Sequence, residues 1–541
     1  MLLRDNKKTR WTMMFIISFV MFAAYVASDN IFSVETNITN PTDGCKVLTK
    51  EEAQELENKD GVTFKTYLTK EEFLADSTQT FAYLPPIQAI EEYTEEIISE
   101  NGATTRTQTD TVWTAHQKVT PGLGVTQSEY DNMAGGYSIF NVYLLMLVIG
   151  GIILDKKGIR FTGIFSCLLM ILGVGMMTWA FFDLKNAIDA GETIQTVKFS
   201  GIMKMFFGPE PRVPMLIAII GLGIYGVGAE IAGITATKVI AKWFAGYELA
   251  LAMGLQLALA RLGTGLAYGT SPAIADMASG NVGVVVLVGL VLLGIGLITL
   301  FIYNAYDKKL DKQLVKSGKH NDSASNDEEE FRLSDIKDVI KNPAFWMIAF
   351  LCLLFYAAVN PFLKYSTGMM VSKFGVSETL AGLFPMILPM GCIVLTPLFG
   401  RVYDKRGHGA DLMILGAVLI TVVHLAFAAP FITNIWIAFL LMILLGVGFA
   451  MLPSAMWPSI AKIMPAKLLG TTMALTFFIQ NIGFIFVPKA IGAIKETTNN
   501  DYSMVMLFFA GLGVVALVLA LGVKVLDKKK HYGLQEPNTK E

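Results

Sequence analysis

The sequence predicts an all-α membrane protein with twelve transmembrane helices in two pseudo-symmetric six-helix bundles. Three observations lead to this prediction. The 541 residues are 53% hydrophobic and only 16% charged, which excludes an ordinary soluble enzyme. The charges gather in a few loops and leave apolar stretches of about 20 residues, the length at which a helix crosses the hydrocarbon core of a bilayer. A short motif that follows the second apolar stretch recurs after the eighth.

The apolar stretches divide the chain into two halves. We place them at 11–33, 129–154, 159–182, 213–240, 247–275, 281–305, 343–372, 377–400, 411–430, 434–461, 467–494 and 502–526. They predict an N-terminal bundle over 1–305 and a C-terminal bundle over 343–526. A cytoplasmic linker, 306–342, joins the bundles, and a cytoplasmic tail, 527–541, follows the second one.

Basic residues predict the orientation, because loops rich in Lys and Arg stay in the cytoplasm. The N-terminus, the turns after the second and eighth stretches, and the tail are all basic, with Arg10, Lys157, Arg401 and Lys528 among their residues. An even number of spans puts all of these on one side, so both termini are predicted to be cytoplasmic. The first stretch is longer than the apolar region of a usual signal peptide, and we interpret it as an uncleaved helix.

Two loops are longer than the others. Residues 34–128 form an extracytoplasmic insertion with 16 Asp and Glu against 7 Lys and Arg, and its aromatic residues predict a small folded unit of open role. The linker is polar over 317–330. It then becomes amphipathic at Leu333, Ile336 and Val339, ahead of the seventh helix.

The repeated motif is the sharpest feature of the sequence. Gly-Ile-Ile-Leu-Asp-Lys-Lys-Gly over 151–158 recurs as Gly-Arg-Val-Tyr-Asp-Lys-Arg-Gly over 400–407. Each copy follows the second helix of its half, and such a repeat is typical of a transporter built from two equivalent bundles.

The motif predicts a cytoplasmic gate. An aspartate at the membrane surface can cap a helix or pair with a basic residue, and such a contact would hold the bundles together in an outward-facing state. The alternative is an ordinary basic turn, which would explain a single copy of the motif better than two copies at the same position in the two halves. The predicted gate residues are Gly151, Asp155, Lys156, Gly158, Gly400, Asp404, Lys405, Arg406 and Gly407.

The motif resembles the signature turn of the major facilitator superfamily, and twelve helices with a long central loop are similar to that family. A narrower set of strings resembles its lysosomal dipeptide transporter branch. These strings include Tyr25-Val-Ala-Ser-Asp29-Asn30, Tyr137-Ser-Ile-Phe-Asn141, Gly228-Ala-Glu230, Ala260-Arg261, Trp457-Pro458 and Gln480-Asn481. The resemblance implies the family's two-bundle fold and a dipeptide cargo.

Glu230 and Arg261 are the main candidates for substrate binding, because a charge at bilayer depth is costly and usually functional. The resemblance places both in a central cavity. There they would keep each other ionised and part to bind the ammonium and carboxylate of a zwitterion. The alternative is a permanent ion pair that locks the fourth helix to the fifth.

Other polar residues complete the predicted substrate site, each with a structural alternative. Asp29 could bind an ammonium group or be solvated at the interface, and Lys364 could attract a carboxylate or snorkel to the outer surface. For the remaining candidates, packing in the core is the alternative: Tyr25, Asn30, Tyr137, Asn141, Trp457, Gln480 and Asn481.

The sequence carries no Walker loop, no Cys/His metal cluster and no nucleophile elbow, so we predict no enzyme activity, no cofactor and no metal. Leu222 stands where many superfamily members have an arginine, and the usual antiporter glycine–proline pattern is reduced to Gly269-Thr-Ser-Pro272. Both departures favour uniport or weak proton linkage over coupled antiport.

We therefore expect a secondary transporter that moves small zwitterionic solutes, above all dipeptides, by alternating access. A proton-coupled carrier of organic anions or sugars is one alternative. A non-transporting receptor or scaffold that uses 34–128 is another. The expected partners are a small-molecule substrate and the lipid bilayer, without nucleic acid or an accessory subunit, in a monomer or homodimer. We expect the cell (inner) membrane, with a lysosomal membrane as the alternative.

Overall fold

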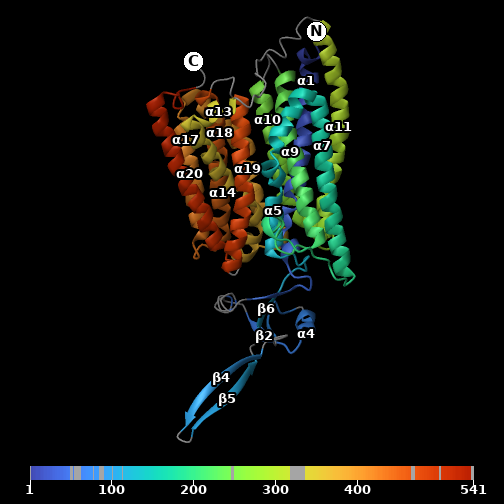
Figure 1. Cartoon of the computed structure of the whole chain (residues 1–541), viewed down its shortest axis with the longest axis vertical. Coiled ribbons are helices and arrows are strands. Elements are labelled where there is room, and N and C mark those ends of the chain that lie inside the picture. Colours follow the sequence, from blue (N-terminus) through green and yellow to red (C-terminus); the bar gives the residue numbers. More distant parts are fainter. Residues whose placement is uncertain are drawn as a thin grey trace. The chain divides into compact units, whose positions relative to one another are not determined.

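The computed structural model describes residues 2–48, 53, 56, 63–76, 78–84, 90–99, 102–111, 114–244, 249–316, 335–464, 469–498 and 501–537. It divides into two compact units (Figure 1). The membrane unit comprises Met1–Glu35 and Thr126–Glu541, and the inserted unit comprises Thr36–Val125. The predicted linker centre, 317–330, and the side chains of Asp155 and Lys156 lie outside the described residues.

The first half of the membrane unit consists of helices that pack mainly on one another. They are η1 (Leu3–Asp5), α1 (Lys7–Asp29), η2 (Phe32–Val34), α5 (Gln127–Gly136), α6 (Ile139–Tyr143), α7 (Met146–Asp189), α8 (Gly201–Phe207), α9 (Val213–Trp243), α10 (Leu249–Met277) and α11 (Val282–Lys316). The short helix α2 (Glu35–Thr39) begins at the last residue of this segment, and its other residues belong to the inserted unit. Helix α1 contacts α9, α10 and α11, and α7 contacts α9 and α11. Most long helices of this half thus pack chiefly on neighbours from the same half, while α10 also contacts α16 of the other half.

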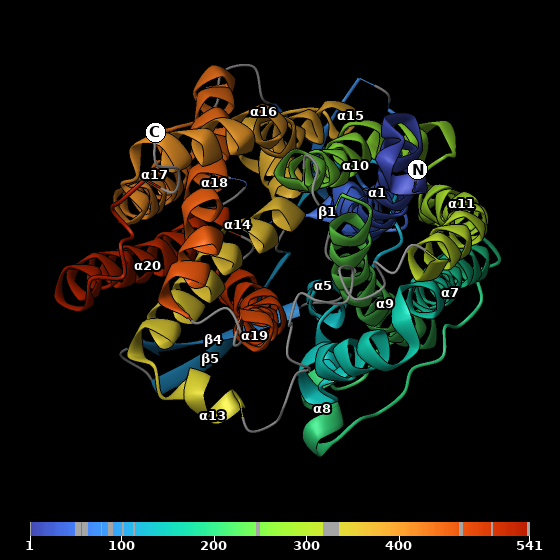
Figure 2. The same cartoon turned by 90° about the horizontal axis from the view of Figure 1, so that it is seen from above.

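The second half repeats this arrangement. Its helices are α13 (Asp335–Ile340), α14 (Pro343–Phe374), α15 (Glu378–Ala381), α16 (Leu383–Arg406), α17 (Gly409–Ala428), α18 (Ile435–Ile463), α19 (Leu469–Thr497) and α20 (Tyr502–Lys530). Side chains of Asn342, Asn434 and Asp501 cap the first turns of α14, α18 and α20. The two sets of helices stand side by side (Figures 1 and 2), joined by contacts of α5 with α19 and of α10 with α16.

Ten helices among the described residues are long and apolar enough to span a membrane. The other two predicted spans correspond to α10 and to the chain from α5 to the start of α7. The prediction of one continuous helix over 129–154 is wrong. The chain leaves the helix around Ser138 and again at Leu145, where φ is 52°. At the first break, the Ser138 hydroxyl donates to Asn481 of α19 at 2.6 Å, so a tertiary contact replaces regular helical pairing there.

The two repeated turns both end on a glycine with positive φ. Gly158 has φ 76° and ψ 170° and separates the two predicted helices that α7 contains. Gly407 has φ 72° and ψ −136° and ends α16. The neighbouring Asp404, Lys405 and Arg406 are exposed at the end of α16. Their role in a gate, with that of Gly151 and Gly400, stays a prediction.

The tail folds back over the second turn. The backbone N–H groups of His408 and Gly409 donate to the carbonyl oxygens of Gln535 and Leu534 at 3.1 and 2.9 Å. Lys462 on α18 donates to the carbonyl of Gly533 at 2.8 Å, and the Leu534 side chain is fully buried. Residues 531–537 therefore tie the end of α16, the start of α17 and the end of α18 together.

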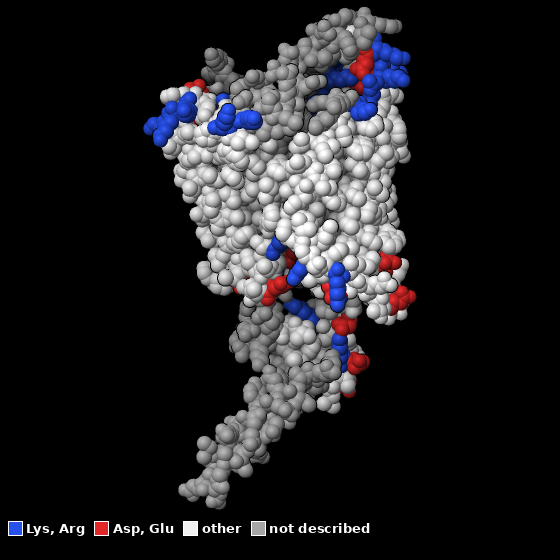
Figure 3. All heavy atoms as spheres, viewed as in Figure 1, with Lys and Arg blue, Asp and Glu red and all other residues white. Residues whose placement is uncertain are grey.

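Charge follows the predicted orientation. In Figure 3, basic side chains gather at the end of the membrane unit where both termini lie, and the flank of the unit on the face shown is almost free of charge. Lys405 and Arg406 end α16, and Lys528 to Lys530 end α20. This distribution agrees with a cytoplasmic location for that end.

The inserted unit is a small β-rich fold. Strands β1 (Cys45–Val47), β2 (Phe64–Thr66), β3 (Phe81–Leu84) and β6 (Thr114–Lys118) form a sheet of order β1-β6-β3-β2, in which only β2 and β3 pair in parallel. Strands β4 (Ile90–Ser99) and β5 (Gly102–Thr111) form a separate antiparallel hairpin. Helix α4 (Lys70–Ala75) brings Phe73 into a core with Tyr67, Ala82 and Leu84.

Asp76 organises the loop after α4. Its carboxylate accepts from the Thr78 hydroxyl and the Tyr67 hydroxyl, both at 2.6 Å, and from Lys65 at 3.3 Å. These donors, Thr78 foremost, hold the pKa of Asp76 below its usual range. Because the pKa of Asp76 is lower in the folded unit than in the unfolded chain, the ionised carboxylate stabilises the folded unit at pH values above the ordinary pKa of an aspartate. The contribution is lost as pH falls through the lowered pKa.

We expect Asp76→Asn, which imitates the protonated form at neutral pH, to loosen the inserted unit alone. Hydrogen exchange should quicken at Thr78 and in β2 and β3, while the exchange of membrane helices is unchanged. The exposed acid Glu72 on α4 provides the control, because Glu72→Gln removes a charge without removing these hydrogen bonds. Equal exchange in the two variants would contradict the role given to Asp76.

The two turn glycines should differ in their tolerance of alanine. The Cβ that Gly158→Ala adds would meet no atom of the described residues, so the substitution costs only the strain of a positive φ, about 1–3 kcal/mol of stability. Gly407→Ala adds a collision with the backbone of Gln535 and Glu536 in the tail. Thermal unfolding of the purified protein should therefore show a larger loss for Gly407→Ala. Deletion of 531–541 should reduce the difference between the two variants, and an unchanged difference would contradict the tail contact.

Candidate central binding site

Glu230 lies in the middle of α9, where its carboxylate meets groups from both halves. Tyr137, at the break between α5 and α6, donates its hydroxyl to Glu230 Oε1 at 3.2 Å. The side-chain amide of Asn481 on α19 donates to the same oxygen at 3.5 Å. The second oxygen, Oε2, has no hydrogen-bond partner among the described residues, and Glu230 is only partly buried. A carboxylate in this state can accept a hydrogen bond from an ammonium group.

Arg261 lies in the middle of α10 with its guanidinium between two aromatic rings. Its Cζ is 5.8 Å from the ring centroid of Tyr25 on α1 and 5.1 Å from that of Phe449 on α18. Within the described part of the chain the guanidinium has neither an ion pair nor a hydrogen bond. Cation–π contacts orient the group and leave its five N–H donors unused. Arg261 therefore presents a planar fork that suits a carboxylate.

The prediction that Glu230 and Arg261 form an ion pair is wrong. Glu230 is held by Tyr137 and Asn481, while Arg261 stacks on Tyr25 and Phe449. Helix α9 packs mainly on α7, whereas α10 packs mainly on α1 and α16, so the two side chains point to different neighbours. Tyr25 contacts Arg261 through its ring and interacts electrostatically with both side chains. The alternative of a permanent lock between α9 and α10 is excluded as well.

Asn481 joins the two halves at this depth. Its Oδ1 accepts the Ser138 hydroxyl at 2.6 Å, and its Nδ2 reaches Glu230 and the carbonyl of Phe477. Every polar atom of this buried amide therefore has a partner, and its three partners lie in different elements: the break after α5, α9 and α19. A change at Glu230 would therefore directly alter a hydrogen bond made by α19.

An aromatic group from the second half borders this region. The Trp457 indole on α18 donates to the Tyr356 hydroxyl of α14 at 3.2 Å and stacks on Phe477 of α19 at 5.0 Å. Phe449 lies edge-on to Tyr356, with ring centroids 6.0 Å apart. Trp457 is partly exposed, so it can contact a bound solute while its N–H is already satisfied.

Besides Asn481, three predicted site residues are buried: Asn30, Asn141 and Gln480. Asn30 donates its side-chain amide to the carbonyl of Val285 in α11 at 2.7 Å, and Gln480 accepts the thiol of Cys352 in α14 at 3.4 Å. Both contacts stay within one half. Asn141 on α6 has no hydrogen-bond partner for either end of its amide among the described residues. A direct role for these three in binding stays a prediction.

Lys364 points inward, so the snorkelling alternative is wrong. Its Nζ donates to the carbonyl of Ala134 in α5 at 2.8 Å and lies 4.1 Å from the ring centroid of Phe32. Lys364 also interacts electrostatically with Asp29, which is partly buried at the end of α1. The carbonyl that α5 exposes near its C-terminal end provides the acceptor that keeps the ammonium between the halves.

Sequence reasoning did not select Tyr356, Phe449 or Ser138. Aromatic residues and serines are common in apolar helices, and nothing in their spacing separates these three from core residues. The only available signal was indirect, since Arg261 needs aromatic or acidic neighbours when it is buried. Their place beside Arg261, Trp457 and Asn481 depends on how the helices pack.

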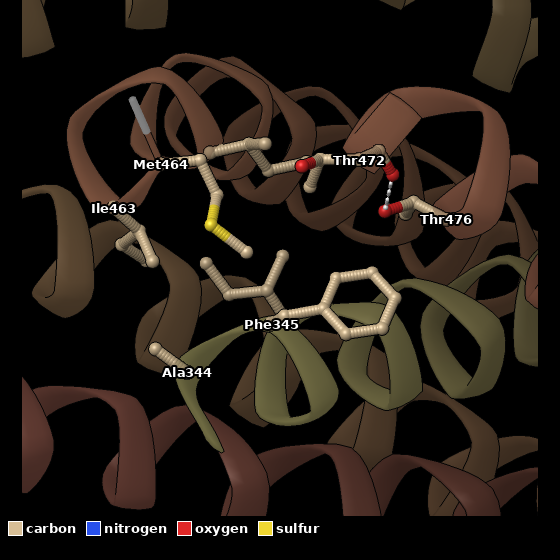
Figure 4. A pocket seen from close by; sticks show the side chains of 8 residues that line it. Ala344, Phe345, Ile463, Met464, Thr472 and Thr476 are labelled. Carbon is tan, nitrogen blue, oxygen red and sulfur yellow. Dashed lines mark hydrogen bonds between the residues drawn. The ribbon is translucent and has the colours of Figure 1, made fainter. Parts of the chain in front are cut away.

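An apolar pocket at the cytoplasmic end of the second half is a different feature. Figure 4 shows Phe345 of α14, Ile463 and Met464 at the end of α18, and Thr472 and Thr476 of α19 around it. The Thr476 hydroxyl is already bonded to the carbonyl of Thr472 at 2.7 Å. Because its lining carries no charge, this pocket does not suit a zwitterion.

Comparison with known proteins identifies related sequences. A family model described as Major Facilitator Superfamily matches residues 102–488. The chain is similar to a protein of Danio rerio named "Lysosomal dipeptide transporter MFSD1", with 26% identity over 427 residues, 77% of this chain and 83% of that protein. The human protein of the same name is 28% identical over 411 residues, 73% of this chain and 78% of that protein. The Gallus gallus protein is 30% identical over 313 residues, 56% and 67% of the two chains.

Solved structures share the fold. A D-xylose–proton symporter aligns with a TM-score of 0.56 and 15% identity, over 95% of this chain and 97% of that chain. A POT family transporter in complex with a thioalcohol-conjugated peptide aligns with a TM-score of 0.57 and 10% identity, over 96% of both chains. At such identities the likeness concerns the fold alone.

A double-mutant cycle can test the separation of Glu230 and Arg261. We expect Glu230→Gln and Arg261→Gln to be additive in the free energy of unfolding, with a coupling below about 0.5 kcal/mol, because the groups do not touch. The control is the pair of Glu129 and Arg212, which are joined at 2.6 Å and should couple by about 1 kcal/mol or more. Coupling of similar size in the two cycles would contradict the site described above.

Proposed function

The chain belongs to the major facilitator superfamily, and on that premise we propose that it transports small zwitterionic solutes, above all dipeptides. As a member of this family it is a multi-pass membrane transporter rather than an enzyme. We propose movement by alternating access about the central site, as a uniporter or with weak proton linkage. The cell membrane stays the predicted compartment, with a lysosomal membrane as the alternative.

The observation that supports a zwitterion is the pair of separated charges at the centre. Glu230 has a free carboxylate oxygen, and the Arg261 guanidinium has no ionic partner in the described residues. Leaving a charge unpaired at bilayer depth is costly. A solute that brings an ammonium to one and a carboxylate to the other would offset both costs.

The length of a dipeptide suits two receptors that stand apart. The terminal ammonium and carboxylate of an extended dipeptide are separated by roughly 7 Å, so a close Glu–Arg pair could not bind both. Tyr25, whose ring contacts Arg261 and which interacts electrostatically with both side chains, can contact the peptide backbone. The aromatic group around Trp457 offers an apolar surface for the side chains of the cargo.

The names of the vertebrate relatives favour dipeptides over other zwitterions. The residues Glu230, Arg261 and Trp457 stand in the strings that resemble those relatives. A free amino acid has its two charges much closer together than a dipeptide does, and would bridge the separated groups less well. Blocking the terminal ammonium or the terminal carboxylate of the dipeptide therefore tests which side chain binds each end.

We expect uptake into proteoliposomes to depend on both ends of the dipeptide. With wild-type protein, N-acetylation or C-amidation of the cargo should each raise KM by roughly 30-fold or more, as loss of one charged contact in a closed site costs about 2 kcal/mol or more. Glu230→Gln should be insensitive to N-acetylation but remain sensitive to C-amidation, and Arg261→Gln should show the reverse. Lys185→Ala, which removes a partly exposed charge paired with Asp189 on α7, is the control.

Two outcomes would contradict this proposal. If Glu230→Gln and Arg261→Gln both keep the saturable dipeptide uptake of the wild-type protein, the binding site lies elsewhere. No transport of any dipeptide, combined with binding of a partner by the inserted unit, would favour the receptor alternative.

A further inference from the structure

A buried charged cluster lies at the end of the membrane unit away from both termini, the extracytoplasmic end by the predicted orientation. We call it the outer cluster, and it consists of Glu35, Asp131, Tyr365, Lys495 and Tyr502. Glu35 is 2% exposed, Asp131 3% and Lys495 3%. Neither the central site nor the proposed binding of a dipeptide uses these residues.

Lys495 on α19 is paired chiefly with Glu35. Its Nζ lies 3.3 Å from Glu35 Oε1 and donates to the Tyr502 hydroxyl of α20 at 3.1 Å. The Tyr502 hydroxyl also donates to Glu35 Oε1 at 3.5 Å, and Glu35 Oε2 lies against Gly368 in α14. The only ammonium of the outer cluster is thus directly occupied by Glu35.

Asp131 on α5 is the second acid of the cluster. Its Oδ1 accepts the Tyr365 hydroxyl of α14 at 2.6 Å and the Gln127 amide at 2.9 Å. Its Oδ2 is buried against Gly492 and has no hydrogen-bond partner among the described residues. An ionised carboxylate with one oxygen buried and unpartnered is much more costly than a neutral carboxyl group.

The charges around Asp131 do not balance. Lys495 and Glu35 interact with it electrostatically, one attracting and one repelling. The other titratable groups near the two acids are tyrosines, and the nearby ammonium of Lys364 on α14 interacts electrostatically with Asp29 instead. The tyrosines are Tyr130 on α5, Tyr268 on α10, Tyr365 on α14 and Tyr502 on α20. Two carboxylates therefore share the Lys495 ammonium in an almost completely buried cluster, and one proton would restore neutrality.

The cluster exists only while the outer ends of the two halves touch. Glu35 and Asp131 come from the first half, whereas Tyr365, Lys495 and Tyr502 come from the second. Two further hydrogen bonds close the same seam, from Tyr130 to the carbonyl of Lys364 at 3.0 Å and from Lys364 to the carbonyl of Ala134 at 2.8 Å. Separation of the halves at this end would expose both acids to water.

We propose that the outer cluster is a proton-binding latch, in which Asp131 holds a proton while the outer gate is closed and releases it when the gate opens. The carboxyl proton goes to extracytoplasmic water, where both acids and Lys495 are then hydrated and ionised. Closing the gate reverses the transfer. Acid on the outer side thus favours the state in which the outer ends are joined.

This assignment names Asp131 rather than Glu35 for a geometric reason. The carboxylate of Glu35 has the Lys495 ammonium 3.3 Å from one oxygen, whereas the carboxylate of Asp131 receives only neutral donors, the Tyr365 hydroxyl and the Gln127 amide. By linkage, the uptake of one proton can change the ratio of closed to open protein by at most about tenfold per pH unit. The latch requires no net coupling of protons to cargo, and it agrees with weak proton linkage.

The gate can be followed by distance measurements between two labels. Ser279, between α10 and α11, and Thr433, between α17 and α18, are exposed at the outer ends of opposite halves. Cysteines there, in a background without the four buried native cysteines, would carry spin labels. With the wild-type cluster we expect the short distance of the closed state to dominate at about pH 5.5. As pH rises to about 8, the ratio of molecules with the longer distance to molecules with the short distance should increase by up to about tenfold per pH unit.

Three substitutions test the role of the proton. Asp131→Asn keeps an oxygen for Tyr365 and Gln127 but cannot ionise, so it should stay closed at both pH values. Tyr365→Phe removes a donor that stabilises the ionised carboxylate, so the transition should move to higher pH. Glu129→Gln, on the same helix but paired with Arg212 inside the first half, should keep the wild-type response.

The proposal would be overturned if Asp131→Asn showed the same pH response as the wild-type protein. It would also be overturned if Tyr365→Phe folded normally and its distance change occurred at the wild-type pH. The inference rests on the alternating-access movement proposed above but not on the identity of the cargo. If saturating dipeptide changes the distance and pH does not, the proton latch alone fails. If neither changes the distance in any variant, the alternating-access proposal fails as well.

Discussion

The hydrogen bonds that Tyr137 and Asn481 donate to Glu230 determine how the centre of this protein is arranged. They satisfy one carboxylate oxygen from two different halves and leave the other free. Because Glu230 is held in this way, Arg261 is not drawn to it and stacks between Tyr25 and Phe449 instead. The separation of the two charges, on which the proposed binding of a zwitterion rests, follows from these contacts.

The same rule governs both charged regions of the membrane unit. A charge at bilayer depth must be paired, solvated or neutralised. At the centre, two separated charges are left for a solute to pair. In the outer cluster, two acids share Lys495, and neutrality is reached when one acid binds a proton. Alternating access would link the two regions, since the halves meet at both depths through α5 and α19.

Much of the site was accessible from the sequence, because charges inside apolar stretches can be recognised without a structure. Glu230, Arg261 and Lys364 were found in this way, and the resemblance to known strings added Trp457 and Asn481. Asp131 and Lys495 carried the same signal more weakly. Asp131 falls near the start of the predicted stretch 129–154 and Lys495 one residue beyond 467–494, where a charge is expected to meet water. The aromatic partners Tyr356 and Phe449 carried no signal of their own.

The sequence by itself determined that the chain crosses a membrane many times in two similar halves, because hydrophobic length and a repeated motif are local properties of the chain. It also indicated that Glu230, Arg261 and Lys364 lie inside apolar stretches, although it did not reveal that Asp131 and Lys495 are buried. Only the tertiary structure decided which charges meet: Glu230 with Asn481 rather than Arg261, Lys364 with a carbonyl of α5, and Asp131 with Tyr365. These pairings depend on the rotation and packing of helices distant in the sequence, and no local pattern encodes that geometry.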